Sequence, residues 1–245
     1  MAMARKSLLR GERNFRWRSP NVSRVENLSD IVFALVLSFA AAQSIPTSFA
    51  DLADLWRDAI AFAACFALIL TIWHTHHAFF RRYEIEDAYT VFLNSVLLLL
   101  ILVFVYPLRL MADFVVTFYT GGYEQTGANP VLSFGQVKYL YLIFGSFYIG
   151  VQVIFALLYA HALRMGAAID LNSRERSYTR YEIEVALGIV AITGLVIALA
   201  FFGPQPWSAM SGVLFALIVL ITWVCGIRAE RRLTSSGAGG VTPSL

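Results

Sequence analysis

The fold of this 245-residue chain is decided by apolar runs such as VFLNSVLLLLILVFVY at residues 91–106, which carries no charged side chain. The whole sequence is 58% hydrophobic and only 14% charged, and its mean hydropathy is +0.66. A soluble domain carries roughly a quarter charged residues. The excess of apolar side chains therefore predicts a polytopic membrane protein. It excludes an ordinary soluble enzyme, a disordered chain and a nucleic-acid binder.

Apolar segments of this kind recur along the chain, and each is long enough to cross about 30 Å of hydrocarbon at a rise of 1.5 Å per residue. They do not alternate with a period of two, which favours helices over a transmembrane barrel. We therefore predict an all-α membrane protein with six transmembrane helices, at residues 24–44, 56–80, 87–110, 138–163, 181–202 and 207–227.

Basic residues are distributed unequally between the two sides of these helices. Of the 19 lysines and arginines, 16 fall in the leader, in the turns after helices two and four, and in the tail. The positive-inside rule then places both termini in the cytoplasm, which agrees with an even number of helices. We expect a basic leader at 1–23, a six-helix domain at 24–232 and a flexible tail at 233–245. In the leader, Phe15-Arg16-Trp17-Arg18 is basic and amphipathic, which predicts an anchor at the membrane interface.

The first predicted helix carries an acid at membrane depth. Ser23 and Glu26 form a Ser-x-x-Glu capping box that starts the helix. Asp30 lies about 9 Å further along the axis than Arg24. Because an unpaired Asp inside a membrane costs about 2.5–3.5 kcal/mol or more, Asp30 needs a partner.

Helical geometry indicates where that partner lies. At 100° per residue, four side chains of the first helix fall in one narrow stripe, and Asp30 lies about 110° from its middle. Asp30 is therefore expected to face a neighbouring helix. The stripe consists of Ile31, Leu35, Ser38 and Ala42.

Helices two and three offer polar side chains at a matching depth. Trp73 and His77 share one face of helix two, and Asn94 lies in the first turns of helix three. Together with Ser29 and Asp30, they are expected to form a closed hydrogen-bond network that positions the helices.

The same residues carry a family resemblance. Residues 24–30, Arg-Val-Glu-Asn-Leu-Ser-Asp, resemble the R-x-x-x-F-S-D signature of the transmembrane protein 175 family of potassium channels, with Leu28 in place of Phe. Residues 72–80 are similar to the family's W-x-x-H-H-x-x-F pattern, and the resemblance, to a bacterial single-repeat member, covers roughly residues 22–110. The resemblance implies that six residues form a structural signature network: Arg24, Ser29, Asp30, Trp73, His77 and Asn94.

The resemblance implies a homotetramer in the cell membrane with the first helices around a central pore that prefers K⁺. It places an apolar constriction at Leu35, followed by Ser38 where the family often has Thr. A leucine ring can gate by dewetting, and a hydroxyl ring offers oxygen ligands to K⁺ and related monovalent cations. No cofactor, metal site or nucleic-acid partner is expected. The pore lining is predicted to be Ile31, Leu35, Ser38 and Ala42.

Other functions compete with this interpretation. A secondary transporter or proton-coupled carrier would use Asp30 and His77 as a relay, and a membrane scaffold would transport nothing. The absence of charged groups along the stripe favours the channel over the carrier. The histidines at 74, 76 and 77 lack an acidic ligand one turn away, which favours a structural role over metal binding. The sequence has no recognisable catalytic triad or phosphate loop, so we expect no enzymatic activity.

Overall fold

The computed structural model describes residues 15, 18, 22–42, 49–120, 134–204, 211–218, 222 and 225. These residues are almost entirely helical. The elements are α1 (Arg24–Ala42), α2 (Phe49–Tyr83), α3 (Ala88–Tyr119), α5 (Phe134–Arg164), α6 (Ser173–Phe202), and the short 3-10 helices η2 (Met165–Ala167) and η3 (Ser211–Ala216).

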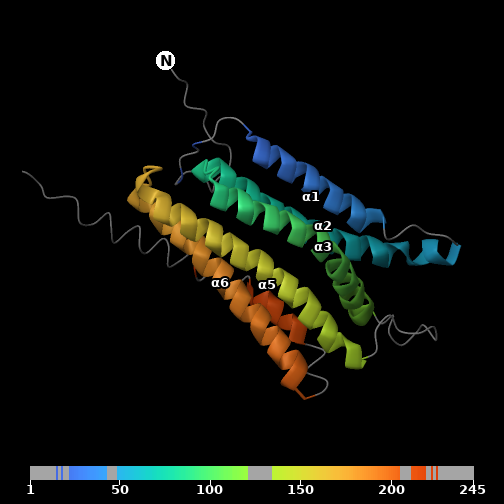
Figure 1. The fold of residues 1–245 in the computed structure, drawn as a ribbon. Coiled ribbons are helices and arrows are strands. Elements are labelled where there is room, and N and C mark those ends of the chain that lie inside the picture. The colour runs from blue at the N-terminus through green and yellow to red at the C-terminus, as the bar shows by residue number, and fades with distance from the viewer. Residues whose placement is uncertain are drawn as a thin grey trace, which may run out of the picture.

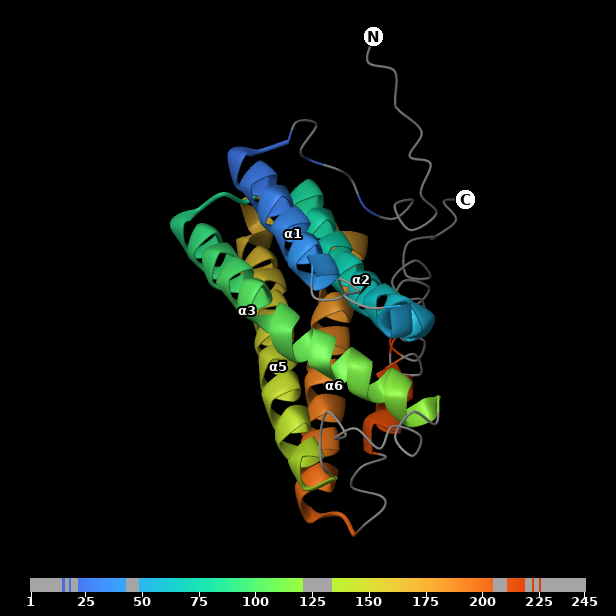
Figure 2. The same cartoon turned by 90° about the vertical axis from the view of Figure 1, so that its right-hand side faces the viewer.

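The long helices form one bundle in which α1 lies at an edge (Figures 1 and 2). Helices α5 and α6 pack against each other, α3 packs on α5, and α2 packs on α3. Helix α1 packs mainly on α2 and α3, on the side of the bundle away from α6 (Figure 1). One side of α1 is therefore left without a neighbour among the described residues of its own chain.

Five helices of the described residues are long and apolar enough to span a membrane: Arg24–Ala42, Leu55–Tyr83, Ala88–Tyr119, Gln136–Ala167 and Ser173–Phe202. They coincide with the first five predicted spans. The sixth prediction, 207–227, falls largely outside the described residues, as do the tail and most of the leader. The chain is a membrane protein of helical fold.

Several helices extend beyond their predicted ends, because hydropathy detects only their apolar part. Helix α3 continues to Tyr119 rather than ending at 110, and α6 begins at Ser173 rather than 181. At the start of α6, the Asn172 side chain accepts a hydrogen bond from the backbone N–H of Glu175, whose own carboxylate accepts one from the Asn172 backbone. This capping box fixes the polar first turns of α6 as helix.

Helix α3 bends within the membrane at a proline. Pro107 lies in its interior, and the direction of the helix changes along its length (Figure 2). A proline removes one backbone donor and clashes with the carbonyl four residues earlier, which kinks a helix. The bend separates the amino-terminal half of α3, which contacts α1, from its outer half.

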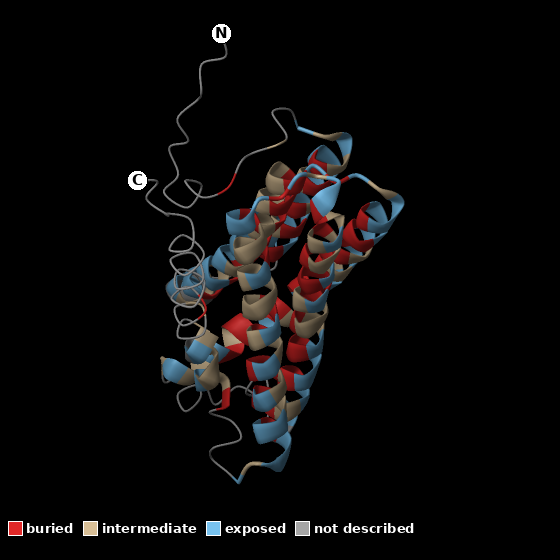
Figure 3. Cartoon of the chain, turned by 90° about the vertical axis from the view of Figure 1, so that its left-hand side faces the viewer, coloured by how far each residue is buried: buried red, intermediate tan, exposed pale blue. Residues whose placement is uncertain are grey.

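Burial follows the arrangement of the bundle. Buried residues line the inner sides of the helices, and exposed residues cover the outer surface (Figure 3). Many of the exposed side chains are large and apolar, up to 89% exposed at Phe202. Contiguous apolar surface of this extent is typical of a membrane or partner contact, which agrees with lipid around the bundle.

A pore-helix candidate and its polar network

The start of α1 is held by a buried carboxylate. The Ser23 hydroxyl accepts a hydrogen bond from the Glu26 N–H at 3.1 Å, and the Glu26 carboxylate accepts one from the Ser23 N–H at 3.4 Å. Glu26 is 1% exposed. Its Oε1 lies 3.1 Å from Nδ1 of His77 and 3.3 Å from Nε of Arg81, both on α2. The capping residue of α1 therefore also ties that helix to α2.

Asp30 faces α2, as its angular position on α1 predicts. The indole Nε1 of Trp73 donates a hydrogen bond of 2.8 Å to Asp30 Oδ1. The Trp73 ring stacks on His77 with 5.4 Å between ring centres. One face of α2 thus presents Trp73 to Asp30 and, one turn later, His77 to Glu26.

Ser29 begins a second chain of hydrogen bonds, directed to α3. Its hydroxyl donates to the Val25 carbonyl at 2.8 Å and accepts from Nδ2 of Asn94 at 3.1 Å. Oδ1 of Asn94 lies 2.8 Å from Nε2 of His76. Because an amide oxygen only accepts, the proton resides on Nε2 of His76. Asn94 therefore joins all three helices.

The predicted network and the observed one differ at one imidazole. The side chain that bonds Asn94 belongs to His76, which is fully buried and is not among the residues predicted for the network. His77 contacts Glu26 instead. The three neighbouring histidines do not converge: His74 is exposed, while the other two point to different partners. Arg24 is also exposed and has no ion-pair partner among the described residues.

The opposite face of α1 carries the predicted stripe. The buried residues of the helix are Glu26, Ser29, Phe33, Val36 and Ala40. At 100° per residue, the stripe of Ile31, Leu35, Ser38 and Ala42 lies about 170° from the centre of that buried face. All four stripe residues are exposed, with Ile31 at 61% and Leu35 at 44%. No described part of the chain covers the stripe.

Comparison with known proteins identifies the family. Residues 24–107, which hold the network, match the family described as the endosomal/lysosomal potassium channel TMEM175. A protein of Marivirga tractuosa named "Potassium channel" is 35% identical over 226 residues, which cover 87% of this chain and 90% of the relative. The chain belongs to the TMEM175 family.

Further comparisons agree with this family. A relative from Chamaesiphon minutus, also named a potassium channel, is 24% identical over 80% of this chain and 91% of its own length. The crystal structure of a variant of the potassium channel MtTMEM175 has a TM-score of 0.75 and 33% identity, covering 89% of this chain and 98% of that one. A TMEM175 homologue structure from Chamaesiphon minutus has a TM-score of 0.52 at 20% identity, covering 82% and 96% of the two chains, and shares the fold.

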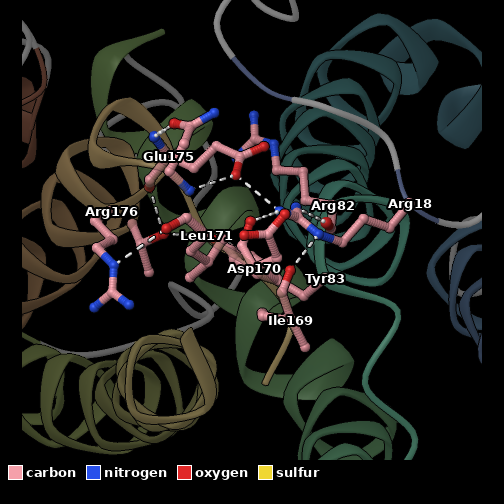
Figure 4. Close-up of polar contacts among 10 residues, drawn as sticks. Arg18, Arg82, Tyr83, Ile169, Asp170, Leu171, Glu175 and Arg176 are labelled. Atoms are coloured by element: carbon pink, nitrogen blue, oxygen red, sulfur yellow. Dashed lines mark hydrogen bonds and ion pairs between the residues drawn. The ribbon is translucent and has the colours of Figure 1, made fainter. Parts of the chain in front are cut away.

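In this TMEM175 chain Arg18 of the leader contacts the end of α2, the α5–α6 turn and the start of α6 (Figure 4). The Arg18 guanidinium donates to the carbonyls of Ile169 at 3.0 Å, Asp170 at 3.1 Å and Arg82 at 3.0 Å. It also pairs with the fully buried carboxylate of Glu175 at 2.8 Å. Arg18 therefore connects the carboxyl end of α2 to the α5–α6 turn and to the first turn of α6.

Phe15 of the same leader is packed into protein. Its ring is 7% exposed and meets Tyr83 edge-on at 5.3 Å. The Arg82 guanidinium lies 5.5 Å from the Phe15 ring centre and pairs with Glu182 at 2.8 Å. The structure corrects the predicted interfacial anchor at Phe15 and Arg18, because both side chains pack against helices of the bundle. Arg16 and Trp17 of the same prediction lie outside the described residues.

Proposed function

We propose that this chain is one subunit of a tetrameric, potassium-preferring cation channel, with the four α1 helices around a central pore. K⁺ passes down its gradient, and the narrowest point is a ring of Leu35 side chains. The potassium-channel names of the relatives from Marivirga tractuosa and Chamaesiphon minutus support this function. Membership of the TMEM175 family supports the same conclusion.

The observation that carries the proposal is the two-sided character of α1. One side holds the polar network with α2 and α3, and the opposite side exposes the stripe that contains Leu35. A helix fixed on one side and uncovered on the other is suited to face a shared axis. Four copies of the stripe would then surround that axis.

The stripe has the chemistry of a narrow cation path. A ring of Leu35 side chains excludes water when the ring is tight, which closes a pore by dewetting. One turn further on, the Ser38 hydroxyl donates to the Ala34 carbonyl at 2.9 Å. This bond directs the hydrogen to the backbone and leaves oxygen lone pairs for a partly dehydrated cation.

The network supplies the rigidity that such a path needs. Asp30 accepts from Trp73, and Ser29 is joined through Asn94 to His76, so α1 is fixed to both neighbouring helices. We assign these contacts a positioning role. The carrier alternative, with Asp30 and His77 as a proton relay, is disfavoured because each of the two side chains is directed to a different partner.

The distribution of charge supports cytoplasmic termini. Arg18, Arg81 and Arg82 lie near the amino-terminal end of α1, together with the start of α6 and its Arg174. At the other end, Arg109 is paired with Asp58 and Asp113 at 3.7 and 3.2 Å. The described arginines and lysines are therefore more numerous at the leader end, which the positive-inside rule assigns to the cytoplasm.

Reconstitution tests the proposal. Purified protein in planar bilayers with unequal KCl concentrations is expected to give currents that reverse near the K⁺ equilibrium potential. The currents should persist without a proton gradient. A coupled exchanger would give electroneutral K⁺ flux that requires a counter-ion gradient, and a scaffold would give none. Either of these results would refute the channel.

A further inference from the structure

A cavity separate from the α1 stripe lies between α2, α5 and α6. Its volume is about 270 Å³, and side chains from all three helices and from residues 218 and 222 form its walls. These helices are candidate membrane spans, so the cavity lies at membrane depth. None of the residues of the stripe or of the polar network lines this cavity, although Ile72 of the lining is next to Trp73 of the network on α2.

One region of the wall holds a hydrogen-bond donor that has no acceptor. Tyr159 lines the cavity, its side chain is almost fully buried, and its hydroxyl has no partner among the described residues. Leaving a buried hydroxyl unpaired destabilises the fold, and a hydrogen-bonding ligand would remove that cost.

The same cavity wall holds a carboxylate whose charge is already balanced. Oε1 of Glu182 accepts a hydrogen bond of 2.8 Å from Arg82. Oε2 of Glu182 receives no hydrogen bond from the described residues. Because the Arg82–Glu182 pair is neutral overall, a charged ligand would have no counter-charge here, while an uncharged donor would satisfy Oε2.

The remaining wall is mainly apolar. Several polar side chains interrupt it. Thr71 donates to the Ala67 carbonyl at 2.8 Å, and Thr75 donates to the Thr71 carbonyl at 3.0 Å. The other polar lining residues are Tyr148, Gln152, Tyr181 and Thr222. The apolar part of the lining comprises Leu68, Ile72, Phe155, Val185, Ala186 and Ile189.

We propose that this cavity binds a small uncharged amphiphile with a hydroxyl head and a short aliphatic tail, taken up from the bilayer. The head accepts a hydrogen bond from Tyr159 and donates one to Glu182, and the tail lies among the aliphatic side chains. Since an apolar cavity of about 150 Å³ holds the six carbons of benzene, a cavity of about 270 Å³ has room for roughly ten heavy atoms. An eight-carbon alcohol fits this size. The proposal does not depend on channel activity.

Photolabelling tests the site. The full chain in phosphatidylcholine vesicles is irradiated with an eight-carbon alcohol that bears a diazirine, and adducts are located by peptide mass spectrometry. We expect saturable adducts on the lining residues of α5 and α6, with 1-octanol as an effective competitor and octane as a much weaker one. Non-saturable labelling of every lipid-facing helix would refute the site, as would equal competition by octane.

Three variants sharpen the test. Tyr159→Phe removes only the hydroxyl and is expected to weaken the apparent affinity about fivefold, the size of one neutral hydrogen bond. Ala186→Trp and Thr71→Trp fill the cavity from opposite walls and should abolish saturable labelling. Leu187→Trp is the matched control, because Leu187 is 53% exposed on α6 and does not line the cavity.

Circular dichroism and gel filtration verify that each variant is folded. If Ala186→Trp does not fold, Thr71→Trp decides, since Thr71 is exposed and tolerates a larger side chain more readily. Unchanged affinity in Tyr159→Phe, or unchanged labelling in a folded cavity-filling variant, would overturn the proposal and leave water as the occupant.

Discussion

Trp73 donates its indole hydrogen to Asp30 over 2.8 Å, so the acid of α1 is satisfied by the neighbouring helix and not by the stripe that faces away from it. The two residues are 43 positions apart in the chain. Their contact separates the polar, packed side of α1 from its exposed side.

Trp73→Phe leaves the Asp30 carboxylate without this donor. We expect a loss of about 1–3 kcal/mol in stability, the cost of an unsatisfied polar group in a partly buried site, and a weaker association of the proposed tetramer. Thermal unfolding and gel filtration in detergent measure both quantities. Asp30→Ala should likewise disrupt the proposed tetramer. A persistent tetramer with abolished K⁺ flux would instead give Asp30 a direct role in conduction.

Leu35→Ala widens the proposed constriction. Single-channel conductance should rise, or the preference for K⁺ over Na⁺ should fall, because a smaller side chain dewets the pore less readily. The matched control is Leu37→Ala, since Leu37 lies on the same helix but is packed against the core. Bilayer recordings with KCl and NaCl on opposite sides decide. Equal effects of the two substitutions on conductance and selectivity would contradict the proposal that Leu35 lines the pore.

Arg18→Ala removes the cation that balances the buried Glu175. Breaking a buried pair in this way costs about 3–5 kcal/mol, so the unfolding temperature should fall strongly. Arg174→Ala, at an exposed arginine directly before Glu175 in the first turn of α6, should have little effect. In a double-mutant cycle with Glu175→Gln, Arg18→Ala should cost much less than it does alone. If the losses of stability in the two single variants simply add in the double variant, the Arg18–Glu175 pair contributes no coupling energy.

The start of α3 should give a pH-dependent contribution to stability. Oδ1 of Asp87 accepts from the Thr90 N–H at 2.9 Å, and Oδ2 accepts from His161 Nε2 at 2.7 Å. Partial burial alone would raise the pKa of Asp87, but the bonds from Thr90 and the pairing with His161 outweigh it and lower the pKa below its usual value of 3.8.

Because the folded-state pKa is lowered, the ionised Asp87 stabilises the fold above its unfolded pKa, and that contribution is lost as pH falls through the folded pKa. Asp87→Asn keeps the capping oxygen but not the charge. It should cost under about 1 kcal/mol at pH 7, and its difference from the parent should shrink below about pH 4. Melting curves from pH 7 to pH 3 test this, with Glu86→Gln as an exposed control.

Local periodicity predicted much of α1. The capping box, the direction of Asp30 and the exposed stripe all follow from 3.6 residues per turn in one helix. The choice between His76 and His77 does not, because the two imidazoles lie about 100° apart on α2. Which of them meets Asn94 depends on how three helices cross, and no repeat within one segment encodes that.

The leader illustrates a second limit. Phe15 and Arg18 have the composition of an interfacial anchor, yet their partners lie up to 157 positions away. The helix start that holds the partner of Arg18 does have a local sequence signal, since Asn172 and Glu175 form an Asn-x-x-Glu capping box at the start of α6. No local pattern showed that the Glu175 carboxylate would also receive Arg18.

The Ser38 hydroxyl has a consequence for the sign of the permeant charge. Its single hydrogen is directed to the Ala34 carbonyl, so a ring of these groups presents oxygen without a donor. Chloride, which needs donors to replace its water, would lose hydration there without compensation. The exposed Arg24 would raise the local concentration of anions at the entrance. The ring of Ser38 side chains would still be a barrier to their permeation. In the proposed pore, anion rejection therefore rests on a hydrogen bond within one helix and requires no acidic side chain.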